Sequence, residues 1–282
     1  MLANARAGRF GFVSKLRSAV EAAGWRSELV PAANEPPGEN TYALHHMSGP
    51  AHPRVMFFRR TYYQPFWHIE REAQRWRWPV ASQIFDPDRI DRDEARAFIH
   101  TLRQKNMPGL SPTRPAHILI PLQEQLTEAR SFQTMSPVEM VKTVAATGRP
   151  CIATLHPRGG YSDAELAALD RLRRRHGNLA IGGDSRELLA GAEFIATQNS
   201  SVAMDAYLLT RPVVLFAQID FHHIALNVAE TGAKAALQRA AGHKAEYAKY
   251  LFWFLQMQSI DASSDQAGQQ MLDALKRGGW PI

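Results

Sequence analysis

Cysteine is almost absent from this chain, since Cys151 is the single one among 282 residues. A lone cysteine excludes a disulfide within the chain and any metal site built from several thiolates, and such usage is typical of a cytoplasmic protein. Long apolar runs are also missing, because none approaches the roughly 18 residues that span a bilayer. The N-terminal residues carry no apolar signal core. We therefore expect a cytoplasmic protein without a membrane span.

Basic side chains outnumber acidic ones, with 33 lysines and arginines against 27 aspartates and glutamates and a net charge of +6. This balance favours an anionic partner, whether nucleotide, phospholipid surface, acidic glycan or nucleic acid, and does not choose among them. Apolar residues make up 45% and charged residues 21% of the chain, as in globular proteins. The length suffices for two domains of ordinary size.

A turn that contains glycines precedes the first predicted helix. Gly8, Arg9 and Gly11 stand directly before a helical pattern at 13–23. A helix start bordered by glycines often faces a ligand cleft, and an ordinary loop is the alternative. Either a short strand at 2–4 opens this domain or its usual first strand is missing. Further short strands are predicted at 29–30, 42–46 and 55–58, around a proline-containing loop at 32–40.

Residues 59–79 are dense in arginine and aromatic side chains. From Pro65 the pattern predicts a helix that stops before Pro79. Its shared face carries Trp67, Arg71, Gln74 and Trp78, with Glu70 beside them. Such a face serves nucleic-acid or glycan binding in some proteins, and aromatic packing at a domain interface is the alternative. Beyond it we predict a strand at 80–85, a helix at 91–105 and a linker between two domains at 108–115.

Residues 116–220 alternate regularly between strand and helix patterns. Ser136–Glu139 and Ser162–Glu165 are capping boxes that open two of the helices. Such alternation predicts a parallel sheet flanked by helices, in which ligands bind beyond the carboxyl ends of the strands. Residues 221–282 are predicted to be helical, with bridging of the two domains as one role. The predicted strands are 117–122, 151–155, 179–181, 194–197 and 213–216, and helices open at 136, 162, 185 and 202.

Polar clusters follow three of these strands. Gln123 and Glu124 come after the first, His156 and Arg158 after the second, and an Asn-Ser-Ser turn after the strand at 194–197. Three such clusters at one sheet edge are hard to attribute to loop chemistry alone, so we expect them to line one crevice. A lone histidine is more often structural than catalytic. The glycine pair that follows His156 and Arg158 suits close approach to a ligand, however, and favours a functional role.

The turn Asn199-Ser200-Ser201 stands between a predicted strand and a predicted helix. Backbone N–H groups and hydroxyls at such a helix start stabilise an anion. Asp205 lies one helical turn after Ser201 and would then accept hydrogen bonds from sugar hydroxyls. The alternative is that Asn199 or Ser200 caps the helix and Asp205 is a solvated acid of its first turn. Spacing alone does not decide between the two.

Two other features have weaker functional interpretations. His222 and His223 are adjacent, and adjacent histidines on a helix point apart, so we expect no metal there. The apolar and aromatic stretch 247–257, flanked by Lys244 and Lys249, predicts a helix that rests on a membrane surface or one that belongs to a core or bridges the domains. The second interpretation is favoured.

Four motifs follow one another along residues 116–220. They are His117-Ile-Leu-Ile-Pro-Leu-Gln123, Thr154-Leu-His156-Pro157, the run Gln198 to Ala206, and Arg211-Pro-Val-Val-Leu-Phe216. This ordered set resembles the bacterial capsule polysaccharide biosynthesis family, which includes the β-Kdo transferases. The resemblance implies a GT-B-like α/β fold of two Rossmann-like domains, with an acceptor-side domain at 1–110, a nucleotide-sugar domain at 116–220 and CMP-Kdo as one donor. It also implies that His156 and the turn 199–201 contact the donor nucleotide, with Asp205 near its ribose.

Two positions depart from the family pattern. Asp205 stands where the family usually has glutamate. The aspartate that serves as catalytic acid shortly after the Pro-Leu-Gln segment is missing, because the chain reads Glu124-Gln-Leu-Thr-Glu128 there. We predict that Glu124 takes its place, with Glu70 from the other domain and then Glu128 as alternatives, and that His156 assists.

The predicted activity is transfer of a sugar from a nucleotide-activated donor to a glycan or glycolipid in capsule or surface polysaccharide synthesis. Gln123 and Arg158 complete the donor set. No metal or cofactor is predicted, because a helix dipole and basic residues can neutralise the phosphate. The alternatives are a non-catalytic glycan- or nucleotide-binding assembly factor and a sugar-nucleotide epimerase; nucleic-acid binding ranks last. The expected location is the cytoplasm, with peripheral contact at the inner face of the membrane as an option.

The predicted acceptor-side residues are Gly8, Arg9, Gly11 and Trp67.

Overall fold

The computed structural model describes residues 2–32 and 35–282. The chain forms two compact units: unit 1 comprises residues 1–83 and 253–282, and unit 2 comprises residues 84–252. This division differs from the predicted boundary at 108–115. Helix α4 (Arg92–Asn106) belongs to unit 2 because it packs against α11 (Tyr247–Phe252). The C-terminal residues are shared, since those up to Phe252 belong to unit 2 and the rest complete unit 1.

Unit 2 is built on a six-stranded sheet in which every pairing is parallel. The predicted α/β architecture with a parallel sheet is thereby confirmed, and the last strand is one that the sequence pattern did not predict. In spatial order the strands are β6 (Leu179–Ile181), β5 (Cys151–Thr154), β4 (His117–Pro121), β7 (Ala192–Thr197), β8 (Val213–Leu215) and β9 (Leu226–Asn227).

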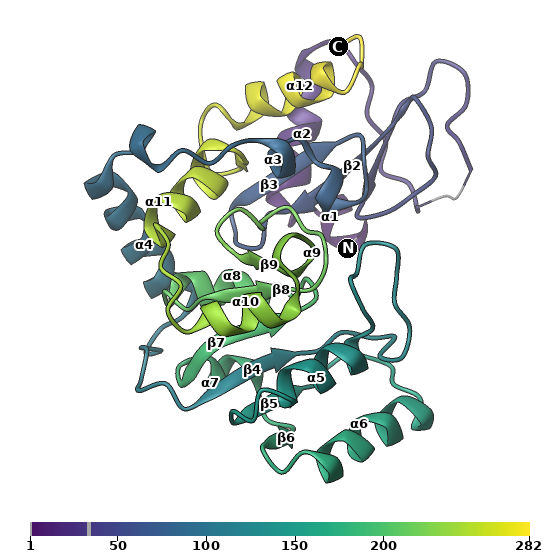
Figure 1. The fold of residues 1–282 in the computed structure, drawn as a ribbon. Helices are drawn as coiled ribbons and strands as arrows, with labels where there is room; N and C mark the ends of the chain where they lie inside the picture. The colour runs from purple at the N-terminus through teal and green to yellow at the C-terminus, as the bar shows by residue number, and fades with distance from the viewer. Residues whose placement is uncertain (1, 33–34) are drawn as a thin grey trace. The chain divides into compact units, whose positions relative to one another are not determined.

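Helices cover both faces of this sheet (Figure 1). Ile118 and Ile120 of β4 point into a core shared with α5 (Pro137–Ala145), α6 (Asp163–Arg175) and α10 (Ala233–Ala240). Leu119 faces the other side because side chains alternate along a strand. There α7 (Ser185–Leu189) and α8 (Val202–Leu208) contact the strands. Both predicted capping boxes are present, at the starts of α5 and α6. Short elements complete the unit: η2 (Pro87–Arg89) and α9 (Val228–Thr231).

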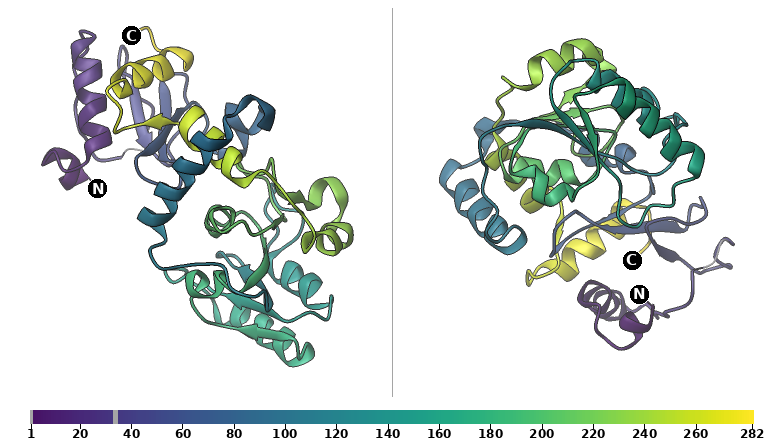
Figure 2. Two further views of the ribbon diagram at one scale, coloured as in Figure 1. Left: turned by 90° about the vertical axis from the view of Figure 1, so that its left-hand side faces the viewer. Right: turned by 90° about the horizontal axis from the view of Figure 1, so that it is seen from below.

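Unit 1 contains a four-stranded sheet of mixed direction. Only β1 and β2 pair in parallel, while β3 pairs antiparallel with both β2 and β10. The predicted Rossmann-like character therefore holds for unit 2 more closely than for unit 1. Helices α2 (Gly11–Ala22) and α12 (Ala267–Arg277) pack against each other, as Figure 2 shows in purple and yellow. The strands, in spatial order, are β1 (Ala43–His46), β2 (Val55–Arg60), β3 (Phe66–Glu70) and β10 (Ile260–Asp261).

Several predictions for the N-terminal third are wrong. The helix predicted from Pro65 is strand β3, followed by the single turn η1 (Arg75–Arg77). The first four side chains of β3 are all buried, and a short apolar run buried on both faces of a sheet cannot be distinguished from a helix by its periodicity. The strand predicted at 80–85 begins as helix α3 (Pro79–Ser82), residues 2–4 belong to helix α1 (Leu2–Arg6), and residues 29–30 are irregular.

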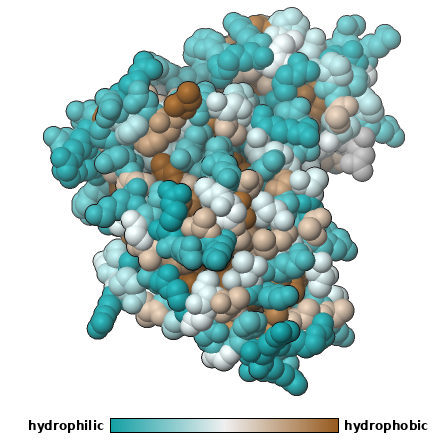
Figure 3. All heavy atoms as spheres, viewed as in Figure 1, coloured by the Kyte–Doolittle hydropathy of each residue, from teal (hydrophilic) through white to brown (hydrophobic). Residues whose placement is uncertain are grey.

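The aromatic stretch at 247–257 is helical, as predicted. Helix α11 continues directly into a π-helical turn, η3 (Trp253–Met257). Most of its large side chains are buried, including Tyr250, Leu251 and Phe254 at 0% exposure, which favours the core interpretation over a membrane surface. Among the described residues, no helix is both long and apolar enough to cross a bilayer. On the face shown in Figure 3, hydrophilic residues predominate and hydrophobic ones form small separate patches.

Candidate functional site

The three predicted polar clusters lie along one edge of the unit 2 sheet. Strands β5, β4 and β7 are neighbours and run in parallel, so their carboxyl ends meet at that edge. Gln123, His156 and Asn199 each stand two residues beyond the end of one of these strands. This is the edge at which open α/β sheets bind ligands.

A hydrogen bond joins the loops that follow β4 and β5. The backbone N–H of Gly160 donates to Oε1 of Glu124 at 3.2 Å. The pairing also extends one residue past the end of β4, because the N–H of Leu122 donates to the carbonyl of Thr154, the last residue of β5, at 2.8 Å. Glu124, the predicted catalytic carboxylate, is thus exposed but held by the N–H of Gly160.

The imidazole of His156 has a defined donor side. Its Nδ1 accepts from the backbone N–H of Arg158 at 3.2 Å. A neutral ring therefore carries its proton on Nε2 and offers an N–H donor there. The backbone N–H of His156 donates to the hydroxyl of Tyr161 at 2.7 Å. Burial raises the pKa of Tyr161. This arrangement suits His156 to donate to a ligand oxygen better than to act as a base.

Most polar groups of the turn after β7 are bonded within the protein. Gln198, only 1% exposed, donates from Nε2 to the carbonyl of Met135 at 2.9 Å. Asn199 donates to the carbonyl of Gln218 at 3.5 Å. The hydroxyl of Ser200 accepts from the N–H of Val202, the first residue of α8, at 3.3 Å, whereas the N-cap residue is Ser201.

Two residues of this turn and helix remain nearer to solvent. Ser201 is exposed, and its side chain makes no capping bond to α8, a helix of seven residues. Asp205 is partly buried in the first turn of that helix. The helix start therefore offers one exposed hydroxyl, that of Ser201, and the anion-binding role of the turn 199–201 stays a prediction.

The loop between β4 and α5 crosses this edge, which the sequence did not indicate. The N–H of Thr134 donates to the carbonyl of Phe216, and the N–H of Gln218 donates to the carbonyl of Phe132, both at 2.8 Å. A bridge between Gln133 and Ala217 lies between these bonds. Because β7 separates β4 from β8, the loop must pass the carboxyl end of β7 to reach them.

Arg130 belongs to this loop and was missed by sequence reasoning. Its guanidinium lies over the ring of Phe132, 4.8 Å from the centroid. Burial lowers the pKa of Arg130 below its usual value, and the nearby negative charge of Glu124 offsets only part of this effect. Its Nε is buried without a hydrogen-bond partner. Nothing in the irregular segment around it distinguished this arginine from others in the sequence, since its position depends on how the loop closes on β8.

The edge therefore contains buried polar atoms with unused bonding capacity. Oε1 of Gln123, Nε of Arg130 and Oε1 of Gln198 are all buried and without a partner. Buried polar atoms of folded proteins are nearly always bonded, so such atoms call for an explanation. A polar ligand at this edge supplies one.

His222 and His223 do not sit on a helix. They lie in a turn before β9, and their rings stack at 4.4 Å, whereas the sequence predicted that they point apart. In residues 2–32 and 35–282, no group of three or more histidine, cysteine, aspartate or glutamate side chains is placed to hold a metal ion.

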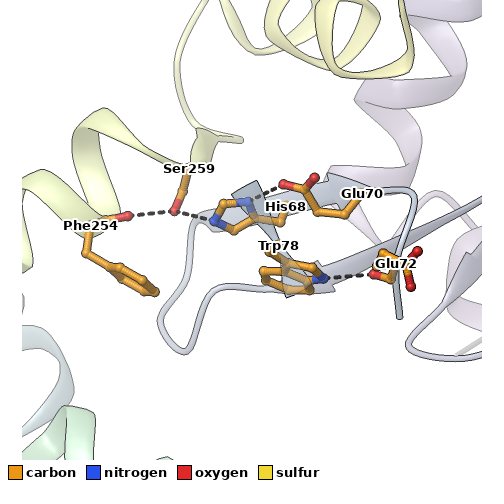
Figure 4. Close-up of polar contacts among 6 residues, drawn as sticks. All are labelled: His68, Glu70, Glu72, Trp78, Phe254 and Ser259. Atoms are coloured by element: carbon orange, nitrogen blue, oxygen red, sulfur yellow. Dashed lines mark hydrogen bonds and ion pairs between the residues drawn. The ribbon is translucent and has the colours of Figure 1, made fainter. Parts of the chain in front are cut away.

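Glu128 is exposed in the loop after β4 of unit 2, whereas Glu70 and the predicted acceptor-side residues belong to unit 1. Glu70 pairs with the buried His68 (Figure 4), with Oε1 and Nδ1 2.9 Å apart. Arg9, Gly11 and Trp67 line one hollow of about 290 Å³ at the start of α2. Gly8 is not among its lining residues and has a φ of 69°. The structure thus gathers three of the four predicted acceptor-side residues.

Unit 2 is an α/β domain with helices on both faces of a parallel sheet and a polar carboxyl edge. No protein-family model matches the chain, and no curated protein matches it. Among solved structures, it is similar to KpsC of Thermosulfurimonas dismutans, a beta Kdo 2,7 transferase, with a TM-score of 0.45 and 13% identity over 70% of this chain and 67% of that one.

Two further structures show weaker similarity. The wall teichoic acid polymerase TagF has a TM-score of 0.30 and 13% identity, over 67% of this chain and 49% of that one. TarM of S. aureus, in complex with fondaparinux, alpha-GlcNAc-glycerol and UDP, has a TM-score of 0.37 and 15% identity, over 61% of this chain and 37% of that one. The chain thus spans about two thirds of the first of these proteins and half or less of the other two.

Proposed function

We propose that this chain is a glycosyltransferase of GT-B type that binds a nucleotide-activated sugar at the carboxyl edge of the unit 2 sheet. One observation carries the proposal. The loops that follow β4, β5 and β8 are joined by hydrogen bonds at that edge, where buried polar side-chain atoms lack hydrogen-bond partners. Glu124 is bonded to Gly160, and the loop that carries Arg130 crosses to the end of β8. Arginine side chains and buried polar atoms at such an edge suit the phosphate groups of a nucleoside monophosphate or diphosphate.

The proposal assigns each residue at the edge a role that suits its chemistry. Arg130 and Arg158 neutralise phosphate charge, and Nε2–H of His156 donates to a phosphate oxygen. Gln123 offers a buried Oε1 to a sugar or base donor group. Asp205 accepts from ribose hydroxyls. Asn199, Ser200 and Ser201 shape the turn, and Ser201 alone of these presents an exposed hydroxyl.

Glu124 is the proposed acid–base or charge-stabilising group. Cleavage of a bond at an anomeric carbon develops positive charge on the sugar, which a carboxylate stabilises or a base assists. The proposed acceptor is a glycan or glycolipid that binds unit 1 at Gly8, Arg9, Gly11 and Trp67. CMP-Kdo as donor and capsule synthesis as the setting follow from the motif resemblance, and both are part of the proposal.

A non-catalytic binding factor is the second candidate. Two observations favour it: the loop 122–136 contains no aspartate, and the carboxylate of Glu124 already accepts from Gly160. In that case the same edge would hold a nucleotide or glycan without turnover.

The test is thermal unfolding with CMP, UDP and GDP and with their sugar conjugates. A ligand that binds only the folded chain raises its stability, by about 2.7 kcal/mol at one hundred times Kd. Arg130→Gln should weaken the ligand that binds by roughly tenfold or more, because a charge-assisted bond is lost. Arg171→Gln, an exposed charge on α6, is the matched control. If no nucleotide shifts the melting temperature, or if both variants bind like wild type, the proposed site is wrong.

A further inference from the structure

Unit 1 has its own hollow at the start of α2, called here the α2 hollow. Its volume is about 290 Å³, just below the range of about 300–1,000 Å³ that is typical of ligand sites. The segments that form it are far apart in the sequence, since the start of α2, the segment before β3 and the segment after β10 all contribute. Its lining residues are Arg9, Phe10, Gly11, Phe12, Lys15, Gln64, Pro65, Trp67, Ala262 and Ser263.

The ionisable side chains of this lining are both cations. Arg9 donates to the side-chain oxygen of Asn4, and Lys15 donates to the carbonyl of Ser264, each at 3.2 Å. Both partners are neutral, so these bonds leave the two positive charges uncompensated. The nearby carboxylate of Asp261 accepts from the backbone N–H and the hydroxyl of Ser263. These donors are neutral, so the carboxylate keeps its charge, and the two cations of the lining outnumber this one nearby anion.

The start of α2 adds to this character. The helix has twelve residues, and Phe10 at its N-cap position supplies no side-chain hydrogen bond. The first N–H groups of such a helix lack partners within it and favour a negative charge. Gly11, the first helical residue, lines the hollow, and a side chain added there would meet no atom within 4 Å.

Three aromatic side chains, Phe10, Phe12 and Trp67, also line the hollow. Phe12 and Trp67 stack with ring centroids 4.5 Å apart, and both are 3% exposed. The indole N–H of Trp67 is buried without a hydrogen-bond partner. An apolar lining with a few polar groups is typical of sites for small organic ligands rather than for a bare ion.

We infer that the α2 hollow binds a sugar residue that bears an anionic group, a carboxylate or a phosphate. The charge is held by Arg9, Lys15 and the start of α2, and the sugar body packs against the apolar lining. Binding of such a sugar does not depend on the proposed function. Only the identification of this sugar as the end of the acceptor glycan rests on it. The acceptor would then be an acidic or phosphorylated glycan.

Direct binding to the full chain tests this without any donor or turnover. The probes are methyl glucuronide, glucose 6-phosphate and the neutral methyl glucoside, titrated by calorimetry at low and at moderate salt. We expect at least one acidic probe to bind tenfold or more tightly than methyl glucoside and to weaken as salt rises. Which acidic probe binds distinguishes a carboxylate ligand from a phosphate ligand.

A matched pair of substitutions locates the site. Gly11→Glu places a carboxylate where the anion would lie, and Gly11→Gln has the same size without the charge. We expect Gly11→Glu to bind the acidic probe at least tenfold more weakly than Gly11→Gln, while its melting temperature is not lowered, since an acid in the first turn suits a helix. Arg9→Gln should weaken binding as well, whereas Arg26→Gln, exposed and outside the lining, should not.

Equal binding of acidic and neutral probes, or equal affinity of the Glu and Gln variants, would overturn the inference. So would the absence of binding to every probe at millimolar concentration. Arg130→Gln separates this result from the proposed donor site, because it should leave the acidic probe unaffected while weakening the nucleotide. Likewise, Gly11→Glu should leave nucleotide binding unchanged.

Discussion

Glu70 and His68, two residues apart on β3, form a bonded pair in which Oε1 lies 2.9 Å from Nδ1. The other ring nitrogen of His68 lies 3.3 Å from the hydroxyl of Ser259, which in turn donates to the carbonyl of Phe254 at 3.0 Å. The ring of Trp78 lies beside the imidazole at 4.8 Å. Figure 4 shows this chain of contacts, which ties β3 to the segment before β10.

This pairing gives Glu70 a structural task besides the catalytic one predicted for it. Glu70→Ala leaves the buried His68 without its partner and should lower the free energy of unfolding by about 1–3 kcal/mol. Glu72→Ala is the control, because the Glu72 side chain is 50% exposed and its contact with Arg77 is 3.8 Å, which is worth little. Urea unfolding measures both. Equal losses of unfolding free energy in the two variants would mean that the pair with His68 adds no stability. A separate assay tests the catalytic role, which reduced turnover per folded molecule of Glu70→Gln would support.

Glu124 is the carboxylate whose removal should affect chemistry most. Glu124→Gln keeps the size of the side chain and an oxygen to accept from Gly160, but it cannot ionise. We expect turnover of the sugar nucleotide to fall on the order of 100-fold or more, with donor affinity retained. Glu128→Gln, exposed in the same loop, should keep its turnover. Wild-type rates in both variants would show that neither glutamate replaces the missing aspartate, and a wild type that binds but never turns over would favour the binding factor.

Glu165 should make the stability of unit 2 depend on acid pH. The backbone N–H of Ser162 and that of Leu126 both donate to this carboxylate, at 2.8 Å and 2.5 Å, and they lower the pKa of Glu165 below its usual 4.5. A lowered folded-state pKa means that the stabilisation is present above pH 4.5 and is lost as pH falls through the lower value.

The measurement compares wild type with Glu165→Gln by urea unfolding between neutral pH and about pH 3. The stability difference should be largest at neutral pH and shrink as pH falls. Asp163→Asn, which alters an exposed acid of the same first turn, controls for the general effect of charge there. A difference that does not change with pH would show that ionisation of Glu165 does not contribute.

Cys151 should be chemically silent in the folded protein. Burial raises the pKa of this thiol to about 11, and the residue is 1% exposed. Because the thiolate is the reactive form, an aromatic disulfide reagent at pH 8 should label native protein only as fast as unit 2 opens. Labelling should accelerate in urea along with unfolding. A native rate close to that of free cysteine would contradict the buried position.

Local signals predicted unit 2 well. The capping boxes at Ser136 and Ser162 define helix starts through short-range bonds between a hydroxyl, a carboxylate and nearby backbone groups. The buried strands between these helices could be predicted from apolar runs of the length of a strand. Three strands were missed. Strands β9 and β10 have only two residues each, so they carry no periodicity to detect, and β3 of unit 1 was predicted to be a helix because its first four side chains are all buried.

By itself the sequence determined the parallel sheet and the order of its strands along the chain, and therefore which polar residues follow the strand ends at Gln123, His156 and Asn199. Only the tertiary structure decided what surrounds them. Arg130 reaches the edge because its loop pairs with residues that lie far along the chain after β8. The same holds for the α2 hollow, where Arg9 meets Trp67 and Ser263. Spacing patterns encode neighbours within one helix or strand, whereas long-range contacts arise from the packing of the whole unit.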